Sequence, residues 1–200
     1  MAYSSGFSPH PRISYAGAAP TGAASEAEYL EIGLATRCDP EQVGRRIDDA
    51  LPAGLDLVQV VPATAGPALA DLLQASHWRL DHRADPDAVA VAVVRFLAAE
   101  SVLVERMTKK GRRELDARAV TVSLAAAGQQ LDLVLRHAVP SVRPDDVVSA
   151  LEQTGAVAWP GPVLCCRLAQ GLLDPVAGTI SDPLLVVDPP ADSTGMAPGR

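Results

Sequence analysis

The sequence has few aromatic residues and few cysteines, and each scarcity excludes a class of protein. Phenylalanine, tryptophan and tyrosine together make up 4% of the 200 residues, so the core must be built mainly from Val, Leu, Ile and Ala. Three cysteines, Cys38, Cys165 and Cys166, are too few and too odd in number for a disulfide framework. They fit a reducing compartment, and we expect a cytoplasmic protein.

Long apolar runs and an excess of basic residues are also missing. No apolar run approaches the roughly 18 residues of a membrane span, and the polar start of the chain does not have the pattern of a signal peptide. The formal net charge is −7, which argues against a generally basic surface for nucleic acid but leaves room for a local basic patch. A hydrophobic fraction of 48% can bury a core, so we expect a soluble α+β protein.

The first part of the chain, residues 1–62, predicts the order β-β-α-β. Strands are expected at 13–18, 28–35 and 55–61. Asp39-Pro40-Glu41 supplies an N-cap, a first-turn proline and a first-turn acid, and predicts a helix to about residue 50. This order is a ferredoxin-like β-α-β-β-α-β unit that lacks its initial strand and helix. We therefore expect a first unit that is truncated at its N-terminus, and Met1 need not be the true start.

A linker at 63–75, rich in Pro, Gly and Ala, leads to a second unit at 76–172. Its expected order is β-α-β-β-β-α-β, with strands at 77–80, 101–107, 118–126, 131–136 and 163–168. Asp85-Pro86-Asp87 favours a helix through residue 99, although the valines that follow leave a strand as an alternative. A last helix is expected from Pro144 to about Gln153. The predicted fold class is α+β, with two ferredoxin-like units in tandem and a disordered tail at 182–200.

One segment concentrates positive charge in this anionic chain. Its basic residues are Arg106, Lys109, Lys110, Arg112, Arg113 and Arg118, and only Glu114 and Asp116 oppose them between residues 106 and 118. The segment spans a strand end and a turn at Gly111, so a hairpin tip would present these side chains to phosphate groups. The alternative is a solvated loop whose charges pair with the neighbouring carboxylates.

The stretch from Gly6 to Arg12, Gly-Phe-Ser-Pro-His-Pro-Arg, is a second candidate. His10 lies between two prolines, which restrict its backbone, and its side chain titrates near neutral pH. Arg12 can bind a phosphate or a carboxylate with two hydrogen bonds. The alternative is a rigid turn that caps a neighbouring element.

Other chemistry-bearing residues lack the spacing of a known site. Cys165 and Cys166 are adjacent, which fits neither a zinc site nor an iron–sulfur cluster. His77 and His82 are five residues apart on an expected strand, so they face opposite sides and cannot share a metal. No nucleotide-binding, nucleophile-elbow or zinc-protease motif is present. We assign no catalytic residue and expect neither a metal nor a cofactor.

Two stretches carry a resemblance to a known family. The first is Ala2-Tyr3-Ser4-Ser5-Gly6-Phe7-Ser8-Pro9-His10-Pro11-Arg12-Ile13-Ser14, followed by residues 22–30. The second is Thr108-Lys109-Lys110-Gly111-Arg112-Arg113-Glu114-Leu115-Asp116-Ala117-Arg118. Together they resemble the radical-SAM-linked protein family, a bacterial domain of unknown function, over about residues 1–170. The resemblance implies a radical SAM protein as partner, fused or encoded nearby, and a strand and helix ahead of the first motif.

These observations favour a non-catalytic RNA-binding module for tRNA or rRNA, which would use His10, Arg12 and the basic segment. A protein-interaction partner of a radical SAM enzyme is the alternative, with the basic segment facing an acidic protein surface. A metal-independent ribonuclease is a further alternative, with His10 as general acid or base and Lys109 or Arg112 stabilising the transition state. The ribonuclease requires His10 to lie close to the basic segment.

Overall fold

The structure is a computed structural model that describes residues 1–63, 66–108 and 111–186. Its first elements are β1 (Ile13–Ala16), β2 (Ala24–Ser25), β3 (Tyr29–Ile32) and α1 (Pro40–Asp48). They are followed by α2 (Leu69–Leu72), β4 (Ala75–Asp81), α3 (Pro86–Ala98), β5 (Leu103–Thr108), β6 (Gly111–Asp116) and α4 (Ala117–Val120). The last elements are β7 (Thr121–Ala127), β8 (Gln130–Arg136), α5 (Pro144–Gly155), β9 (Leu164–Leu173), β10 (Ile180–Ser181) and the 3-10 helix η1 (Pro183–Val186).

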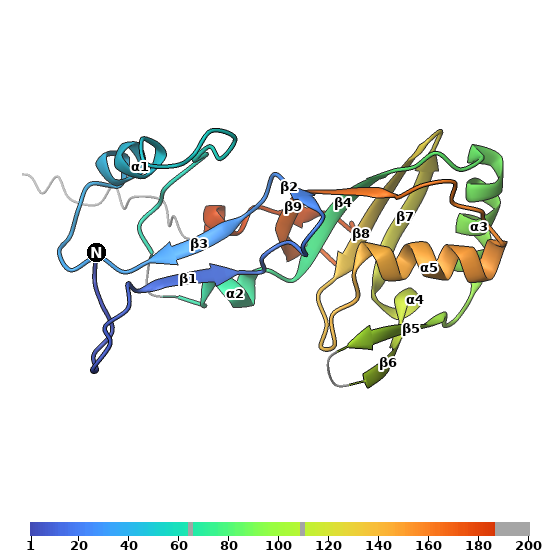
Figure 1. The fold of residues 1–200 in the computed structure, drawn as a ribbon, viewed down its shortest axis with the longest axis horizontal. Helices are drawn as coiled ribbons and strands as arrows, with labels where there is room; N and C mark the ends of the chain where they lie inside the picture. The colour runs from blue at the N-terminus through green and yellow to red at the C-terminus, as the bar shows by residue number, and fades with distance from the viewer. Residues whose placement is uncertain (64–65, 109–110, 187–200) are drawn as a thin grey trace, which may run out of the picture.

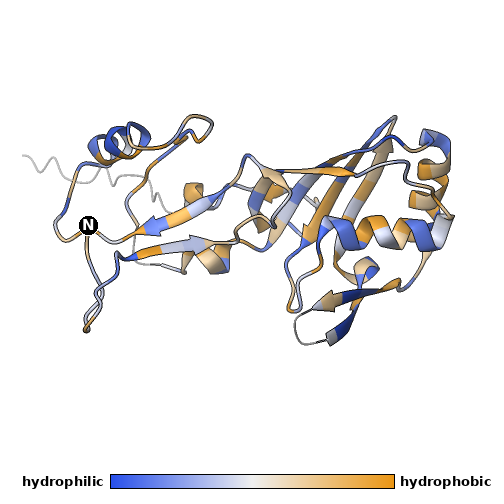
Figure 2. Ribbon diagram, in the orientation of Figure 1, coloured by the Kyte–Doolittle hydropathy of each residue, from blue (hydrophilic) through white to orange (hydrophobic). Residues whose placement is uncertain are grey.

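The main sheet lies at one end of an elongated molecule (Figure 1). Its strand order is β10-β9-β4-β8-β7, and β2 adds to β9 in parallel orientation. Helices α3 and α5 pack on this sheet and on each other, and apolar residues run through the strands and both helices (Figure 2). The core between them contains the fully buried Leu80, Phe96, Leu131, Leu133 and Leu151. It is largely aliphatic, as the composition predicts.

Aspartates begin three of the helices, as helix N-caps do. The Asp39 carboxylate accepts a hydrogen bond from the Glu41 N–H at 3.1 Å, and the Asp85 carboxylate accepts one from the Asp87 N–H at 3.3 Å. Asp116 accepts from the first N–H groups of α4. The segment from Pro86 to Ala98 is therefore a helix and not a strand, and it buries Val89, Val93 and Phe96 on one face.

The first 62 residues form little of the main sheet. β1 and β3 pair as a separate antiparallel two-stranded ribbon, in which Ala16 packs against Leu69 and Leu73. The strand expected at 55–61 does not form. Instead that segment lies beside α1, where Leu57 and Val60 approach Gly44. The structure is thus a mixed α+β fold, and the tandem arrangement of two ferredoxin-like units is not confirmed.

Two further expectations need correction. β5 and β6 pair only with each other, so the strand expected at 101–107 does not join the main sheet. The tail expected at 182–200 is folded at its start, because Pro183–Val186 form η1 and the Asp182 carboxylate accepts a hydrogen bond from the Leu184 N–H at 2.8 Å. The rest of that tail, residues 187–200, lies outside the described residues. In the described part of the chain, no helix has the length and apolarity to cross a membrane.

Candidate nucleic-acid interface

The basic segment folds as the hairpin β5–β6, hereafter the basic hairpin, and continues into α4. Antiparallel pairing places Arg106 opposite Arg113 and Glu105 opposite Glu114. Lys109 and Lys110, which belong to the predicted interface, lie outside the described residues. The described part of the hairpin carries three arginines and three carboxylates, so it has no excess of positive charge.

The guanidinium of Arg106 is hydrogen-bonded to other groups of the protein. Its Nη1 donates to the Asp146 carboxylate at 2.7 Å, and its Nη2 donates to the Ser141 carbonyl at 2.8 Å. Asp146, at the start of α5, is 6% exposed and also accepts from the Arg143 backbone N–H at 2.7 Å. Burial raises the pKa of Asp146, and the Arg143 N–H and Arg106 oppose that rise. Arg106 therefore fastens the basic hairpin to α5, and it is not presented to a phosphate group.

The remaining arginines of the segment divide into two kinds. Arg118 donates to the Leu97 carbonyl at 3.3 Å and to the Thr121 carbonyl at 3.2 Å, so its guanidinium is also used internally. Arg112 forms an exposed ion pair with Glu105 at 3.2 Å, which is readily exchanged for another anion. Arg113 is exposed and forms no ion pair with the described residues. Of the four described arginines, only Arg112 and Arg113 can reach an external ligand.

The stretch around His10 forms a hairpin of its own, residues 2–12, hereafter the N-terminal hairpin. The Ser4 N–H donates to the His10 carbonyl at 2.9 Å, and the His10 N–H donates to the Ser4 hydroxyl at 3.0 Å. Gly33 joins this hairpin to the end of β3, because its N–H donates to the Arg12 carbonyl at 2.7 Å. A Cβ at Gly33 would lie 2.9 Å from the Arg12 Cβ, so only glycine fits there without displacement.

Exposed aromatic side chains accompany His10 and Arg12. Tyr3 is 58% exposed, Phe7 at the hairpin tip is fully exposed, and Tyr15 on β1 is 64% exposed. These are three of only seven aromatic residues in the chain, and no carboxylate occurs before Glu26. Sequence reasoning identified His10 and Arg12 but not this aromatic surface. The clustering of aromatic residues near the N-terminus was its signal, but their exposure is decided by the fold.

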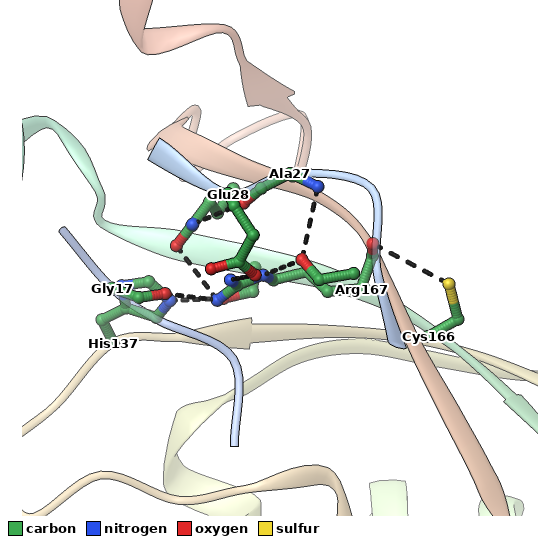
Figure 3. A network of polar contacts seen from close by, with 9 residues as sticks. Gly17, Ala27, Glu28, His137, Cys166 and Arg167 are labelled. Atoms are coloured by element: carbon green, nitrogen blue, oxygen red, sulfur yellow. Dashed lines mark hydrogen bonds and ion pairs between the residues drawn. The ribbon is translucent and has the colours of Figure 1, made fainter. Parts of the chain in front are cut away.

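A buried arginine on β9 fastens the segment that connects β1 to β3 (Figure 3). Arg167 is 3% exposed, donates through Nη2 to the Glu28 carboxylate, and donates through Nη1 to the Gly17 carbonyl at 2.6 Å. Its Nε donates to the Ser25 hydroxyl at 3.1 Å, and the guanidinium lies 5.5 Å from the centre of the Trp78 ring. Arg167 therefore binds three points of residues 17–28 to the main sheet.

Two polar side chains complete this network. Gln170 is 1% exposed, accepts from Arg167 at 3.2 Å and donates to the Ala27 carbonyl at 2.6 Å. His137 contacts the Leu73 carbonyl through Nδ1 at 2.7 Å and the Ser76 hydroxyl through Nε2. Burial lowers the pKa of His137, and the positive charge of Arg167 lowers it further. Both ring nitrogens have partners, so His137 acts as a neutral structural group.

The two predicted contact regions do not meet. Figure 1 shows the N-terminal hairpin, ahead of β1, at one end of the long axis and the basic hairpin in the opposite half of the molecule, beside α5. The ribonuclease alternative needs His10 beside Lys109 or Arg112. Arg112, on β6, lies far from the N-terminal hairpin (Figure 1), and Lys109 lies outside the described residues. We therefore do not propose a ribonuclease.

The exposed face of β4 and β8 carries charge pairs in place of stacking groups. His77 contacts Asp132 at 2.7 Å, and Arg79 lies 3.5 Å from Asp81. His82, in contrast, is 4% exposed and packs edge-on against Trp159. The two histidines thus have different surroundings, and the sheet itself is a poor platform for unpaired bases.

Comparison with known proteins identifies a family. Residues 1–144 match the family described as an uncharacterized protein conserved in bacteria (DUF2344). The chain belongs to this family. The match includes the N-terminal hairpin, the ribbon and the basic hairpin, whereas Arg167 on β9 lies beyond it. No curated protein and no solved structure matches the chain.

Proposed function

We propose that this chain is a non-catalytic RNA-binding module whose main contact surface is the N-terminal segment, residues 1–16. The observation that carries the proposal is the exposure of Tyr3, Phe7 and Tyr15 beside Arg12 in a stretch without carboxylates. Single-stranded RNA is bound by aromatic side chains that stack on its bases and by cations that contact its backbone. Unpaired loops of tRNA or rRNA supply such bases.

Because the molecule has a net negative charge, base stacking is expected to supply most of its affinity for RNA. The net charge of −7 repels a polyanion at long range, whereas each stacked base contributes about 1–3 kcal/mol. Arg12 and His10 give few phosphate contacts. For single strands the logarithm of the binding constant falls with the logarithm of salt by about 0.7 per contact, so we expect a shallow slope of roughly −1 to −2.

The basic hairpin provides a second, weaker contact region in this proposal. Arg113 and Arg112 are exposed, and Lys109 and Lys110 adjoin them in the sequence. Because this hairpin lies in the opposite half of the molecule from the N-terminal hairpin (Figure 1), it would contact a different part of a long RNA. A short oligonucleotide that covers the N-terminal segment should not need it.

The test is fluorescence anisotropy with a uridine 12-mer and with a duplex of equal length. We expect the single strand to bind more tightly than the duplex, and Phe7→Ala to weaken single-strand binding about tenfold or more. Leu55→Ala is the matched control, because Leu55 is 58% exposed but lies outside the N-terminal segment. Failure of the 12-mer to bind at low salt, or equal binding by Phe7→Ala and wild type, would overturn the proposal.

A second candidate is a docking module for a radical SAM protein, as the family resemblance implies. The ribbon favours it, because the register of β1 and β3 places Ile13 opposite Ile32 and Tyr15 opposite Leu30 on one face. Ile13 is 48% exposed and Leu30 is 43% exposed, so this face is apolar and open. An apolar strand of the partner would extend the ribbon by backbone pairing. Nuclease-resistant co-purification with the neighbouring radical SAM protein would favour docking over RNA binding.

We also infer the architecture that holds these surfaces. The path β4-α3-β7-β8-α5-β9 with strand order β9-β4-β8-β7, every neighbour antiparallel, supports a ferredoxin-like unit at 76–172 that carries the basic hairpin as an insertion. The linker at 63–75 contains α2, which buries Leu69 and Leu72. The cytoplasmic location stays a prediction.

A further inference from the structure

An open cavity of about 460 Å³ lies where β4 begins and β8 and β9 end. This volume is in the range of small-molecule sites. Its lining residues are Leu73, Gln74, Arg136, His137, Leu173 and Pro175. They come from three segments of the chain, 73–74, 136–137 and 173–175, and the cavity adjoins the Arg167 network through His137. The cavity is independent of the RNA surface proposed above.

The walls of this cavity are fixed by backbone hydrogen bonds. The His137 N–H donates to the Gln74 carbonyl at 2.7 Å, and the Gln74 N–H donates to the Gly171 carbonyl at 2.8 Å. On the far wall, the Asp174 N–H donates to the Thr179 carbonyl at 2.9 Å. A ligand would therefore meet a preformed site and would lose little affinity to ordering of the protein.

The chemistry of the lining selects the ligand. Leu73, Leu173 and Pro175 are apolar, and the His137 ring is neutral with both nitrogens already bonded. Arg136 is exposed and forms no ion pair with the described residues, so its guanidinium is the cation available to a ligand.

Asp174, the acidic residue next to Pro175, already has hydrogen-bond partners within the chain. The Asp174 carboxylate accepts from the Val176 and Ala177 N–H groups at 2.8 and 3.0 Å. The Asp174 carboxylate is therefore hydrogen-bonded within its own turn, and it does not compete with an external anion for Arg136.

We propose that this cavity binds a small molecule with an apolar body and one carboxylate, which Arg136 holds through two hydrogen bonds. The apolar body lies against the two leucines and the proline. Gln74 offers a further donor through its Nε2, because its Oε1 already accepts from the Leu173 N–H at 3.2 Å.

The test uses decanoate and decanol, which share an apolar chain and differ in charge, with calorimetry on the full chain. We expect decanoate to bind more tightly than decanol, and Arg136→Gln to weaken decanoate about tenfold and leave decanol unchanged. Arg83→Gln is the matched control, since Arg83 is an exposed arginine just beyond the other end of β4. In NMR titrations, the amide resonances of Gln74, His137 and Leu173 should shift.

Three results would overturn the proposal. Decanoate binding that equals decanol binding would show that the cavity does not select a carboxylate. Equal decanoate binding by Arg136→Gln and wild type would show that Arg136 does not hold it. Shifts confined to residues outside the cavity, such as the β1–β3 ribbon, would show nonspecific apolar binding. None of these results depends on whether the chain binds RNA.

Discussion

Arg167 and Glu28 form an ion pair whose two members differ in exposure: the guanidinium side chain is 3% exposed and the carboxylate side chain is 38% exposed. The pair joins β9 of the main sheet to the residue just before β3. A buried guanidinium that loses its counter-charge keeps the cost of its desolvation. The attachment of residues 17–28 to the main sheet therefore depends on Glu28, whose carboxylate is open to solvent.

We expect Glu28→Gln to lower the free energy of unfolding by about 1–3 kcal/mol, because a charge-assisted hydrogen bond to a buried group is lost. Glu31→Gln is the control, since Glu31 on β3 is exposed and forms no ion pair with the described residues. That variant should change the free energy by less than about 0.5 kcal/mol. Urea unfolding measures both, and equal values would show that the ion pair does not hold the segment.

Two glycines of the N-terminal part should differ in their tolerance of alanine. Gly17 has φ +60° and a Cβ there would lie 2.6 Å from Oε1 of the buried Gln170, whereas Gly22 has φ +94° and open space around it. Both alanine variants strain the backbone because φ is positive at these positions. Only Gly17→Ala also places a methyl group too close to Gln170 in the Arg167 network. We expect Gly17→Ala to be less stable than Gly22→Ala by at least about 1 kcal/mol. Thermal unfolding compares them, and the reverse order would contradict the geometry.

The arginines of the basic segment should separate into structural and surface residues. Arg106→Gln removes two internal hydrogen bonds and leaves the buried Asp146 without its ion-pair partner, so a loss of about 1–3 kcal/mol is expected. Arg112→Gln breaks only an exposed ion pair and should cost less than about 0.5 kcal/mol. Chemical denaturation gives both values. A stable Arg106→Gln variant would mean that the basic hairpin does not need α5.

Stability should fall on mild acidification because the pKa of His137 is lowered in the folded chain. Burial and Arg167 lower the pKa of His137 below its ordinary value of 6.5. Below that pH the unfolded chain binds the proton before the folded chain does, so this stabilisation is complete above pH 6.5 and is lost as the pH falls.

His137→Gln should flatten the decline in unfolding free energy between about pH 7.5 and 5.5. Some slope should remain, because burial also lowers the pKa of His82. Unfolding curves at a series of pH values test this. The same slope in wild type and His137→Gln would exclude His137 as its source.

The three thiols should differ in reactivity toward iodoacetamide. Burial, with the nearby Asp145 carboxylate, raises the pKa of Cys165 to about 12, so almost no thiolate is present at pH 8. Burial and Glu26 also raise the pKa of Cys166, whereas Cys38 is exposed. We expect Cys38 to be alkylated first and Cys165 to stay unmodified in the folded protein. Mass spectrometry of peptides after timed labelling identifies the sites, and early labelling of Cys165 would contradict its burial.

Local sequence signals located most helices and strands of the second half. Asp85-Pro86 placed α3 within a residue, and the alternation of Leu131, Leu133 and Leu135 gave β8, because caps and periodicity act over a few residues. The strand expected at 55–61 failed for the converse reason. A strand needs a partner for its backbone, and no local pattern shows whether one is available.

The sequence suffices to propose candidate site residues, but it does not show which of them are exposed. His10 and Arg12 were found from their proline-rich setting, and their hairpin leaves both exposed. Arg106 and Arg118 were chosen for charge alone, and the fold uses both internally. The partner of Arg106 is 40 residues away in sequence, a distance over which charge counting gives no information.

The sequence by itself determined the aliphatic core, the helix starts and the placement of positive charge, since these depend on composition and on neighbours along the chain. The tertiary structure alone decided which side chains face solvent and which pair across the fold. Tyr15 lies exposed on its ribbon, and Arg167 is buried against Glu28 from 139 residues away. Exposure and ion pairing depend on long-range packing, in which segments distant in sequence compete for the same surface and the same hydrogen bonds.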